Sequence, residues 1–169
     1  MSKGRIAVTG AGGFVGREIV RQALAGGWRV IALVRDPGAL AELKGPCLSL
    51  VEWRVGEPFP AIAELQGADA LCHLAAFIPP DFSDAAYAEE CLRVNALGAL
   101  RAAEQALADG VGRFLHFSSG QVYENLGRPA REGDPVFPSA RAAYYLGSKL
   151  AGEIFVDHVR LRSGAPAAV

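Results

Sequence analysis

Tyr145 and Lys149 are two chemically useful side chains that the sequence places four residues apart. On a helix, this spacing brings both side chains to one face. A free tyrosine titrates near about 10, so a base that works near neutral pH needs a pKa lower by roughly three, or about 4 kcal/mol. A neighbouring lysine ammonium favours the phenolate. We therefore interpret Tyr145 as an acid/base group acting on a hydroxyl or carbonyl, with Lys149 lowering its pKa.

Ser119 is a third candidate catalytic residue. It follows the apolar run 113–117, and it could donate a hydrogen bond to the same substrate oxygen. Tyr144 is the alternative to Tyr145, but it lies five residues from Lys149 and so points to a different face of the helix. The predicted catalytic set is Ser119, Tyr145 and Lys149.

A glycine-rich turn, residues 9–16 (TGAGGFVG), lies between an apolar run and a helical pattern. Gly10 allows a tight turn, Gly13 lets the backbone approach a pyrophosphate, and Gly16 lets the helix pack closely on the strand. The N-terminus of the helix offers free N–H groups and the positive end of its dipole to phosphates. This turn predicts a dinucleotide site, with contacts from Gly10, Gly13, Phe14, Val15 and Gly16.

Apolar runs alternate with helical patterns along the chain, which indicates βαβ units. Strands are expected at 5–9, 29–34, 48–55, 69–74 and 113–117, and helices at 14–25, 36–43, 84–108 and 139–162. Residues 165–169 look like the start of a sixth strand, so we expect a truncated chain. The predicted class is α/β, a doubly wound, Rossmann-like parallel sheet of order 3-2-1-4-5 with a partial sixth strand and helices on both faces.

Composition narrows the functional class. The 169 residues are 51% hydrophobic and 21% charged, which suits one folded domain. The net charge of −1 gives no electrostatic footprint for nucleic acid or anionic membrane, and no run reaches the ~18 apolar residues of a membrane span. We expect a cytoplasmic protein with a small-molecule substrate and neither nucleic acid nor membrane as a partner.

Cysteines and histidines form no ligand pattern. The cysteines are far apart and are interpreted as buried thiols in a reducing cytosol: Cys47, Cys72 and Cys91. The histidines are interpreted as a strand-end, a core and a helix-surface residue, respectively: His73, His116 and His158. They are too scattered for a metal site, so no metal is expected.

The ordered motifs resemble those of the extended short-chain dehydrogenase/reductases, also called the NAD-dependent epimerase/dehydratase family. The glycine turn matches the family's TGxxGxxG pattern. Residues 69–76 match its DxVxHLAA, 95–98 its NxxGT, 117–123 its SSxxVYG and 145–153 its YxxSKxxxE. The resemblance covers essentially the whole chain.

The resemblance implies an NAD(P)-dependent oxidoreductase or epimerase that acts on a sugar nucleotide or another small carbonyl or alcohol compound. It selects Ser119 over Ser118, because the catalytic residue stands three before the valine of VY. It also implies further cofactor contacts from Leu74, Ala75, Ala76, Asn95, Tyr145 and Lys149. Residues 1–169 would form the NAD(P)-binding Rossmann domain, with the C-terminal substrate-binding region absent. The alternative is a non-catalytic NAD(P)-binding module or sensor of the same fold.

The sequence departs from the family pattern at several positions. Ala99 replaces a threonine, and Glu124 replaces a glycine. Gly120 and Gln121 stand where sugar-nucleotide dehydratases carry Asp-Glu, which argues against that dehydratase chemistry. Glu57 stands where an aspartate usually faces the adenine, so that contact is left open.

The residues at the end of the second predicted strand indicate whether the cofactor is NAD or NADP. NAD-preferring members carry an acidic residue there, whereas this chain has Val34 followed by Arg35, as in members whose arginine pairs with the 2′-phosphate. We therefore favour NADP over NAD. Asp36 is the alternative acid, but it precedes Pro37 and could instead start a helix.

An apolar stripe on the final helix bears on whether the protein forms a dimer. Leu150, Ile154 and Leu161 lie roughly 140–180° around the helix from Tyr145, so they face away from the predicted site. Such stripes commonly mark interfaces, and members of the family often dimerise through this helix and the one before the fifth strand. We expect a two-fold homodimer. The alternative is that residues 120–138 cover the stripe.

Overall fold

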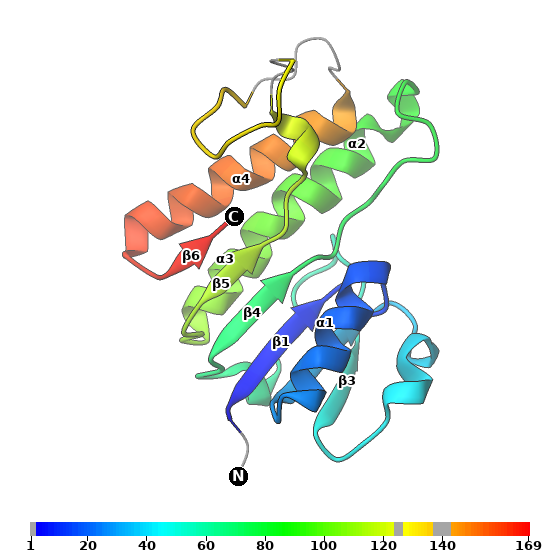
Figure 1. Cartoon of the computed structure of the whole chain (residues 1–169), viewed down its shortest axis with the longest axis vertical. Coiled ribbons are helices and arrows are strands. Elements are labelled where there is room, and N and C mark those ends of the chain that lie inside the picture. The colour runs from blue at the N-terminus through cyan, green and yellow to red at the C-terminus, as the bar shows by residue number, and fades with distance from the viewer. Residues whose placement is uncertain (1–2, 124–126, 137–142) are drawn as a thin grey trace.

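The computed structural model describes residues 3–123, 127–136 and 143–169, and it places helices on both faces of a central sheet (Figure 1). The sheet has six strands in the order β3-β2-β1-β4-β5-β6. Every pair of neighbouring strands is parallel. The predicted α/β class, the strand order and the sixth strand beside the fifth are therefore confirmed.

The strands follow the predicted apolar runs closely. They are β1 (Arg5–Thr9), β2 (Arg29–Val34), β3 (Leu48–Glu52), β4 (Ala70–His73), β5 (Phe114–His116) and β6 (Ala167–Ala168). Strand β3 ends three residues before the predicted end. There Val55 forms only an isolated bridge with Glu57, across Gly56 at φ +96°, so the chain turns away from the sheet.

The helical segments are α1 (Phe14–Ala25), η1 (Pro37–Leu43), η2 (Ala63–Leu65), η3 (Ala85–Tyr87), α2 (Ala88–Cys91), η4 (Leu92–Leu97), α3 (Gly98–Ala108), η5 (Gly120–Val122) and α4 (Tyr144–Ser163). Helix α1 has the predicted bounds. Segment η1 is a 3₁₀ helix with a kink at Leu40. The predicted start of the final helix, residues 139–142, lies outside the described residues, as does Glu124.

The single helix expected over residues 84–108 is wrong in detail. It divides into η3, α2, a π-helical segment η4 and α3. In the π-helical segment, Asn95 is buried and its side chain bonds the backbone of Phe77. Single-turn π segments are often found at functional sites. Here the irregularity coincides with a tertiary contact that helix periodicity does not register.

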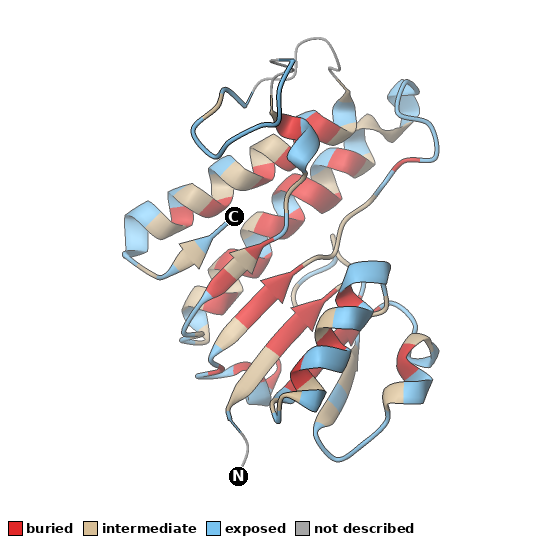
Figure 2. Cartoon of the chain, viewed as in Figure 1, coloured by how far each residue is buried: buried red, intermediate tan, exposed pale blue. Residues whose placement is uncertain are grey.

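Two apolar clusters fill the space on the two faces of the sheet. Alternate residues of β2 point to opposite faces, as strand geometry requires. Ile31 and Leu33 pack with α3 and α4, while Val30, Ala32 and Val34 pack with α1 and η1. Figure 2 shows the buried residues along the strands and the inward sides of the helices. The sheet is thereby fixed between helices, and the carboxyl ends of its strands meet at one edge.

One expectation about the cysteines is wrong. Cys72 and Cys91 are buried as predicted, but Cys47 is exposed. It lies in the turn after Gly45 and Pro46, before β3 begins. None of the helices in the described parts of the chain is long and apolar enough to cross a membrane.

Candidate functional site

The glycine turn connects β1 to α1 and lies against the segment that leaves β4. Gly10 has φ +66°, and a Cβ there would lie 2.8 Å from the backbone nitrogen of Ala75. A Cβ on Gly16 would overlap the carbonyl oxygen of Gly10. Both positions therefore exclude a side chain, which agrees with the roles predicted for them. The same packing brings Ala75, with Leu74 and Ala76 beside it, to the turn.

The N-terminus of α1 fits a phosphate group. Gly13 is exposed and occupies the N-cap position, where no side chain caps the helix. The backbone N–H groups of the first turn are thus available to an anion. Phe14 and Val15, which begin the helix, are 98% and 50% exposed, so nothing in the described chain covers this end.

A buried network fixes the β4 end beside the turn. The hydroxyl of Thr9 shares a hydrogen bond of 2.9 Å with Nδ1 of His73 and accepts another from the backbone N–H of Ala75. Thr9 and His73 are both buried. Sequence reasoning placed His73 at a strand end but gave Thr9 no such role, although the threonine before the first glycine was a visible signal.

Lys149 lies inside the protein, on the face of α4 that packs against the sheet. Only 2% of it is exposed, and its ammonium donates a 2.6 Å hydrogen bond to the carbonyl oxygen of Phe117. Tyr145, one turn earlier, is partly buried, whereas Tyr144 is 45% exposed. Tyr145 is therefore the more buried of the two tyrosines, and its choice as the catalytic residue stays a prediction. Lys149 joins α4 to the loop that follows β5.

Electrostatics at this pair differ from the simple expectation. Burial raises the pKa of the Tyr145 phenol, and the Cys91 thiol adds to the rise. Burial also lowers the pKa of Lys149 to about 8, against the opposing effect of the Glu153 carboxylate. In this structure burial, and not the lysine charge, dominates the pKa of Tyr145. The spacing alone could not reveal this, because it says nothing about solvent access.

Ser119 caps the short helix η5 in the same loop. Its hydroxyl oxygen accepts a hydrogen bond from the backbone N–H of Gln121 at 3.3 Å. A hydroxyl that accepts such a bond keeps its own proton for donation. The neighbouring Ser118 turns instead to α4 and donates a hydrogen bond to the Glu153 carboxylate. This last contact was not predicted.

Asn95 holds the segment after β4 in place. Its amide oxygen accepts from the N–H of Phe77 at 2.7 Å, and its amide nitrogen donates to the Phe77 carbonyl and to Ser148. Ser148 in turn donates to the carbonyl of Tyr145 at 2.7 Å. The buried side chain thus ties three elements together, and its proximity to a cofactor stays a prediction.

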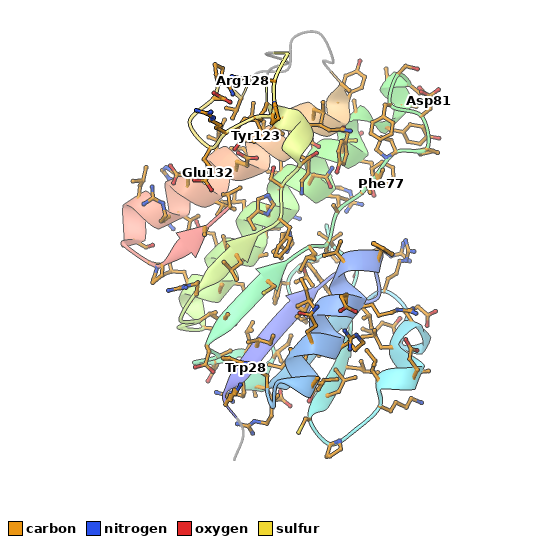
Figure 3. All side chains as sticks on the ribbon, viewed as in Figure 1. Trp28, Phe77, Asp81, Tyr123, Arg128 and Glu132 are labelled. Atoms are coloured by element: carbon orange, nitrogen blue, oxygen red, sulfur yellow. The ribbon has the colours of Figure 1, made fainter. Side chains whose placement is uncertain are left out.

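An aromatic residue outside the predicted set contacts Tyr145. Phe82, in the loop between β4 and η3, meets the Tyr145 ring edge-on at a centroid distance of 5.4 Å. Figure 3 shows Phe77 on the segment that leaves β4 and Tyr123 on the one that follows β5. Both segments extend from the carboxyl ends of their strands, so they lie at the same end of the sheet as the glycine turn. No motif pointed to Phe82.

The end of β2 lies at the same edge. Val34 is buried, and Arg35 is exposed. The Asp36 carboxylate accepts a 2.8 Å hydrogen bond from the N–H of Gly38 and so caps η1. Of the two interpretations of Asp36, the structure favours the start of a helix.

Two histidines are stacked beneath the site. His73 and His116 are both buried, with ring centroids 5.7 Å apart. Burial lowers the pKa of His116 to about 3, with a further contribution from the Lys149 charge, and it also holds the pKa of His73 well below its ordinary value. Both are therefore neutral. His158 is exposed, and the described residues contain no cluster of acidic, cysteine and histidine side chains fit to hold a metal.

Curated proteins of known activity resemble the chain over most of its length. A dTDP-glucose 4,6-dehydratase of Streptomyces niveus is 31% identical over 164 residues, which are 89% of this chain and 47% of the relative. A UDP-glucose 4-epimerase of Mycolicibacterium smegmatis is 32% identical over 92% of this chain and 51% of its own length. A ceramide reductase of Caulobacter vibrioides is 36% identical over 70% of this chain and 35% of its own.

Solved structures of other proteins also resemble the chain over nearly its whole length. The dTDP-glucose 4,6-dehydratase DesIV of Streptomyces venezuelae, with NAD bound, superposes with a TM-score of 0.84 at 29% identity, over 96% of this chain and 53% of that one. MoeE5 in complex with UDP-glucose and NAD superposes with a TM-score of 0.78 at 27% identity, over 98% of this chain and 52% of that one. The chain therefore spans about half the length of these relatives.

Residues 6–169 match the family described as "NAD dependent epimerase/dehydratase family". The chain is a member of the NAD dependent epimerase/dehydratase family.

Proposed function

We propose that residues 1–169 form the NAD(P)-binding domain of an oxidoreductase or epimerase in which Tyr145 is the acid/base. The observation that carries the proposal is the link between α4 and the loop after β5. Lys149, one turn from Tyr145, bonds Phe117, and Ser119 follows two residues later. These groups extend from the same edge of the sheet as the glycine turn, where open α/β sheets bind their ligands.

Each residue has a distinct role. Ser119 donates a hydrogen bond to the substrate oxygen, and Tyr145 exchanges a proton with that oxygen. Lys149, held by the Phe117 carbonyl, favours the phenolate form of Tyr145. A bound nicotinamide cofactor supplies the hydride acceptor or donor, and its oxidised ring adds positive charge. Gly13 and the first turn of α1 bind the pyrophosphate.

The substrate class follows from relatives and from one departure. Two relatives act on sugar nucleotides by name, and MoeE5 binds UDP-glucose. In this chain Gly120 and Gln121, which begin η5, stand in place of the Asp-Glu of the dehydratases. We therefore propose oxidation, reduction or epimerisation of a sugar nucleotide or another small carbonyl or alcohol, without dehydration.

Turnover by two matched tyrosine variants tests the function. Tyr145→Phe in the full-length protein should abolish turnover and leave cofactor affinity within about twofold, because the hydroxyl serves the chemical step. Tyr144→Phe, on the neighbouring exposed residue, should keep most of the activity. Activity that survives Tyr145→Phe and disappears in Tyr144→Phe would reverse the assignment. Cofactor binding without turnover of any substrate by the wild type would favour the binding-module alternative.

We further propose that the cofactor is NADP. Arg35 is exposed at the end of β2, and the nearest acid, Asp36, caps η1. Arginine pairs well with a phosphate, so Arg35 suits the 2′-phosphate. The solved relatives DesIV and MoeE5 bind NAD, so the prediction separates this chain from them. NADPH should bind at least about tenfold tighter than NADH, or 1.4 kcal/mol, and Arg35→Ala should remove the difference. Tighter binding of NADH would exclude the proposal.

We also propose a homodimer through α4. Ile154 and Leu161 are 60% and 68% exposed, and Leu150 is partly buried. The described part of the 120–138 loop leaves Ile154 and Leu161 exposed. Exposed apolar stripes of this kind favour association.

A further inference from the structure

The loop after β5 is fastened to α4 at two successive residues. Lys149 donates to the carbonyl oxygen of Phe117, and Ser118 donates to the Glu153 carboxylate. Lys149 and Glu153 are four residues apart, so they lie one above the other on one face of the helix. Ser119 is the next residue of the loop. Its position relative to α4 is therefore determined by two contacts and not by one.

The two contacts act on different features of Ser119. The Lys149 contact holds the backbone of the loop, whereas the Glu153 contact holds a side chain and so restricts rotation of the segment. Ser119 has extended backbone angles (φ −140°, ψ 129°), and successive side chains of an extended chain point to opposite sides. Fixing Ser118 on the helix therefore limits the directions open to the side chain of Ser119.

Glu153 also acts on the lysine electrostatically. Burial lowers the pKa of Lys149, and the Glu153 carboxylate opposes that fall. Among the described residues, the buried and neutral His73 and His116 also interact with Lys149. Within that part of the chain, Glu153 is the negative charge that shifts the pKa of Lys149.

We propose that Glu153 is a positioning residue of the active site: its carboxylate holds Ser118 and so orients Ser119 toward the substrate oxygen. The proposal rests on the catalytic function proposed above. Neither Glu153 nor Ser118 touches the reacting atoms in this arrangement. Both act through their neighbours.

Four variants of the full-length protein separate the two effects. Glu153→Ala and Ser118→Ala should each lower kcat about tenfold, with the cofactor Kd within about twofold of the wild type, because misplaced catalytic groups slow the chemical step. The double variant should be no slower than Glu153→Ala, since each single substitution already removes the same hydrogen bond between Ser118 and Glu153. Glu153→Gln keeps an acceptor for Ser118 and should recover most of kcat. The control is Asp157→Asn, one turn further along α4, where the acid pairs with Arg160 and should not affect kcat.

The charge effect has its own readout. The pKa of Lys149, followed by NMR of its ammonium group, should be lower in Glu153→Gln than in the wild type and unchanged in Asp157→Asn. A wild type without turnover refutes the proposed function, whereas an active wild type with an equally active Glu153→Ala refutes the positioning role. An unchanged Lys149 pKa in Glu153→Gln refutes the electrostatic role whether or not the protein turns over a substrate.

Discussion

Mild acid should destabilise the protein through its buried histidines. The pKa of His116 is about 3 in the folded protein, against 6.5 for a free side chain. Between these values the unfolded chain binds a proton that the folded protein does not, so the free energy of unfolding falls as the pH falls. At about pH 5, which is 1.5 below the free value, the loss from His116 is roughly 1.5 × 1.36, or about 2 kcal/mol. Above about pH 7 the loss disappears.

His116→Leu isolates this effect. The ring nitrogens of His116 have no hydrogen-bond partner among the described residues, so the substitution breaks no such bond there. Urea unfolding followed by tryptophan fluorescence, at about pH 7.5 and about pH 5, gives the change in free energy for each protein. The wild type should lose about 2 kcal/mol more than His116→Leu between these conditions.

The control is His158→Gln, because His158 is exposed on α4. It should show the same pH dependence as the wild type. If the wild type and His116→Leu lose equal stability on acidification, His116 is not held neutral and the interpretation of the buried pair is wrong. His73 should remain as a second source of acid sensitivity in the variant, since its pKa is also well below the ordinary value.

Substitutions at three other positions test separate features of the fold and assembly. Gly10→Ala should lower the free energy of unfolding by at least about 1 kcal/mol in urea denaturation, because φ is +66° and Ala75 leaves no room for a Cβ; a fully stable variant would contradict the packing. Asp36→Ala should cost about 0.5–1 kcal/mol in the same assay through loss of the cap on Gly38, and no loss would show that the cap is unimportant. Ile154→Lys should convert a dimer to a monomer in light scattering at micromolar concentration, and a monomeric wild type or an unaffected dimer would exclude the α4 interface.

Much of the fold could be predicted because the governing signals are local. The bounds of β1, α1 and β2 follow from the glycine turn at one end of α1 and from Gly26 and Gly27 at the other. The strand order follows from the alternation of strands and helices in a parallel sheet. These features depend on short-range backbone preferences and periodicity, which a single sequence contains.

The features that could not be predicted depend on contacts between distant residues. The π-helical segment at Asn95 is accompanied by a hydrogen bond to Phe77, eighteen residues away. The bond between Ser118 and Glu153 spans thirty-five residues, and the contact of Phe82 with Tyr145 joins a loop to a helix that only the fold brings together. Spacing predicted that Tyr145 and Lys149 share a face, but solvent exclusion, which determines their pKa values, is a property of the packed protein.

Binding of a dinucleotide to Gly13→Asp tests the proposed cofactor site most directly. Gly13 is exposed at the N-cap of α1 with φ −76°, which any residue can adopt, and aspartate is a favourable N-cap residue. A Cβ at Gly13 would lie 3.2 Å from the backbone carbonyl oxygen of Gly10, which is a tight contact, so the favourable cap offsets a steric cost and the variant should still fold. Its carboxylate should nevertheless occupy the anion site and weaken NADPH binding at least about tenfold, or 1.4 kcal/mol, in a fluorescence titration. A folded Gly13→Asp that binds NADPH as tightly as the wild type, or a wild type that binds no dinucleotide, would contradict the proposed site.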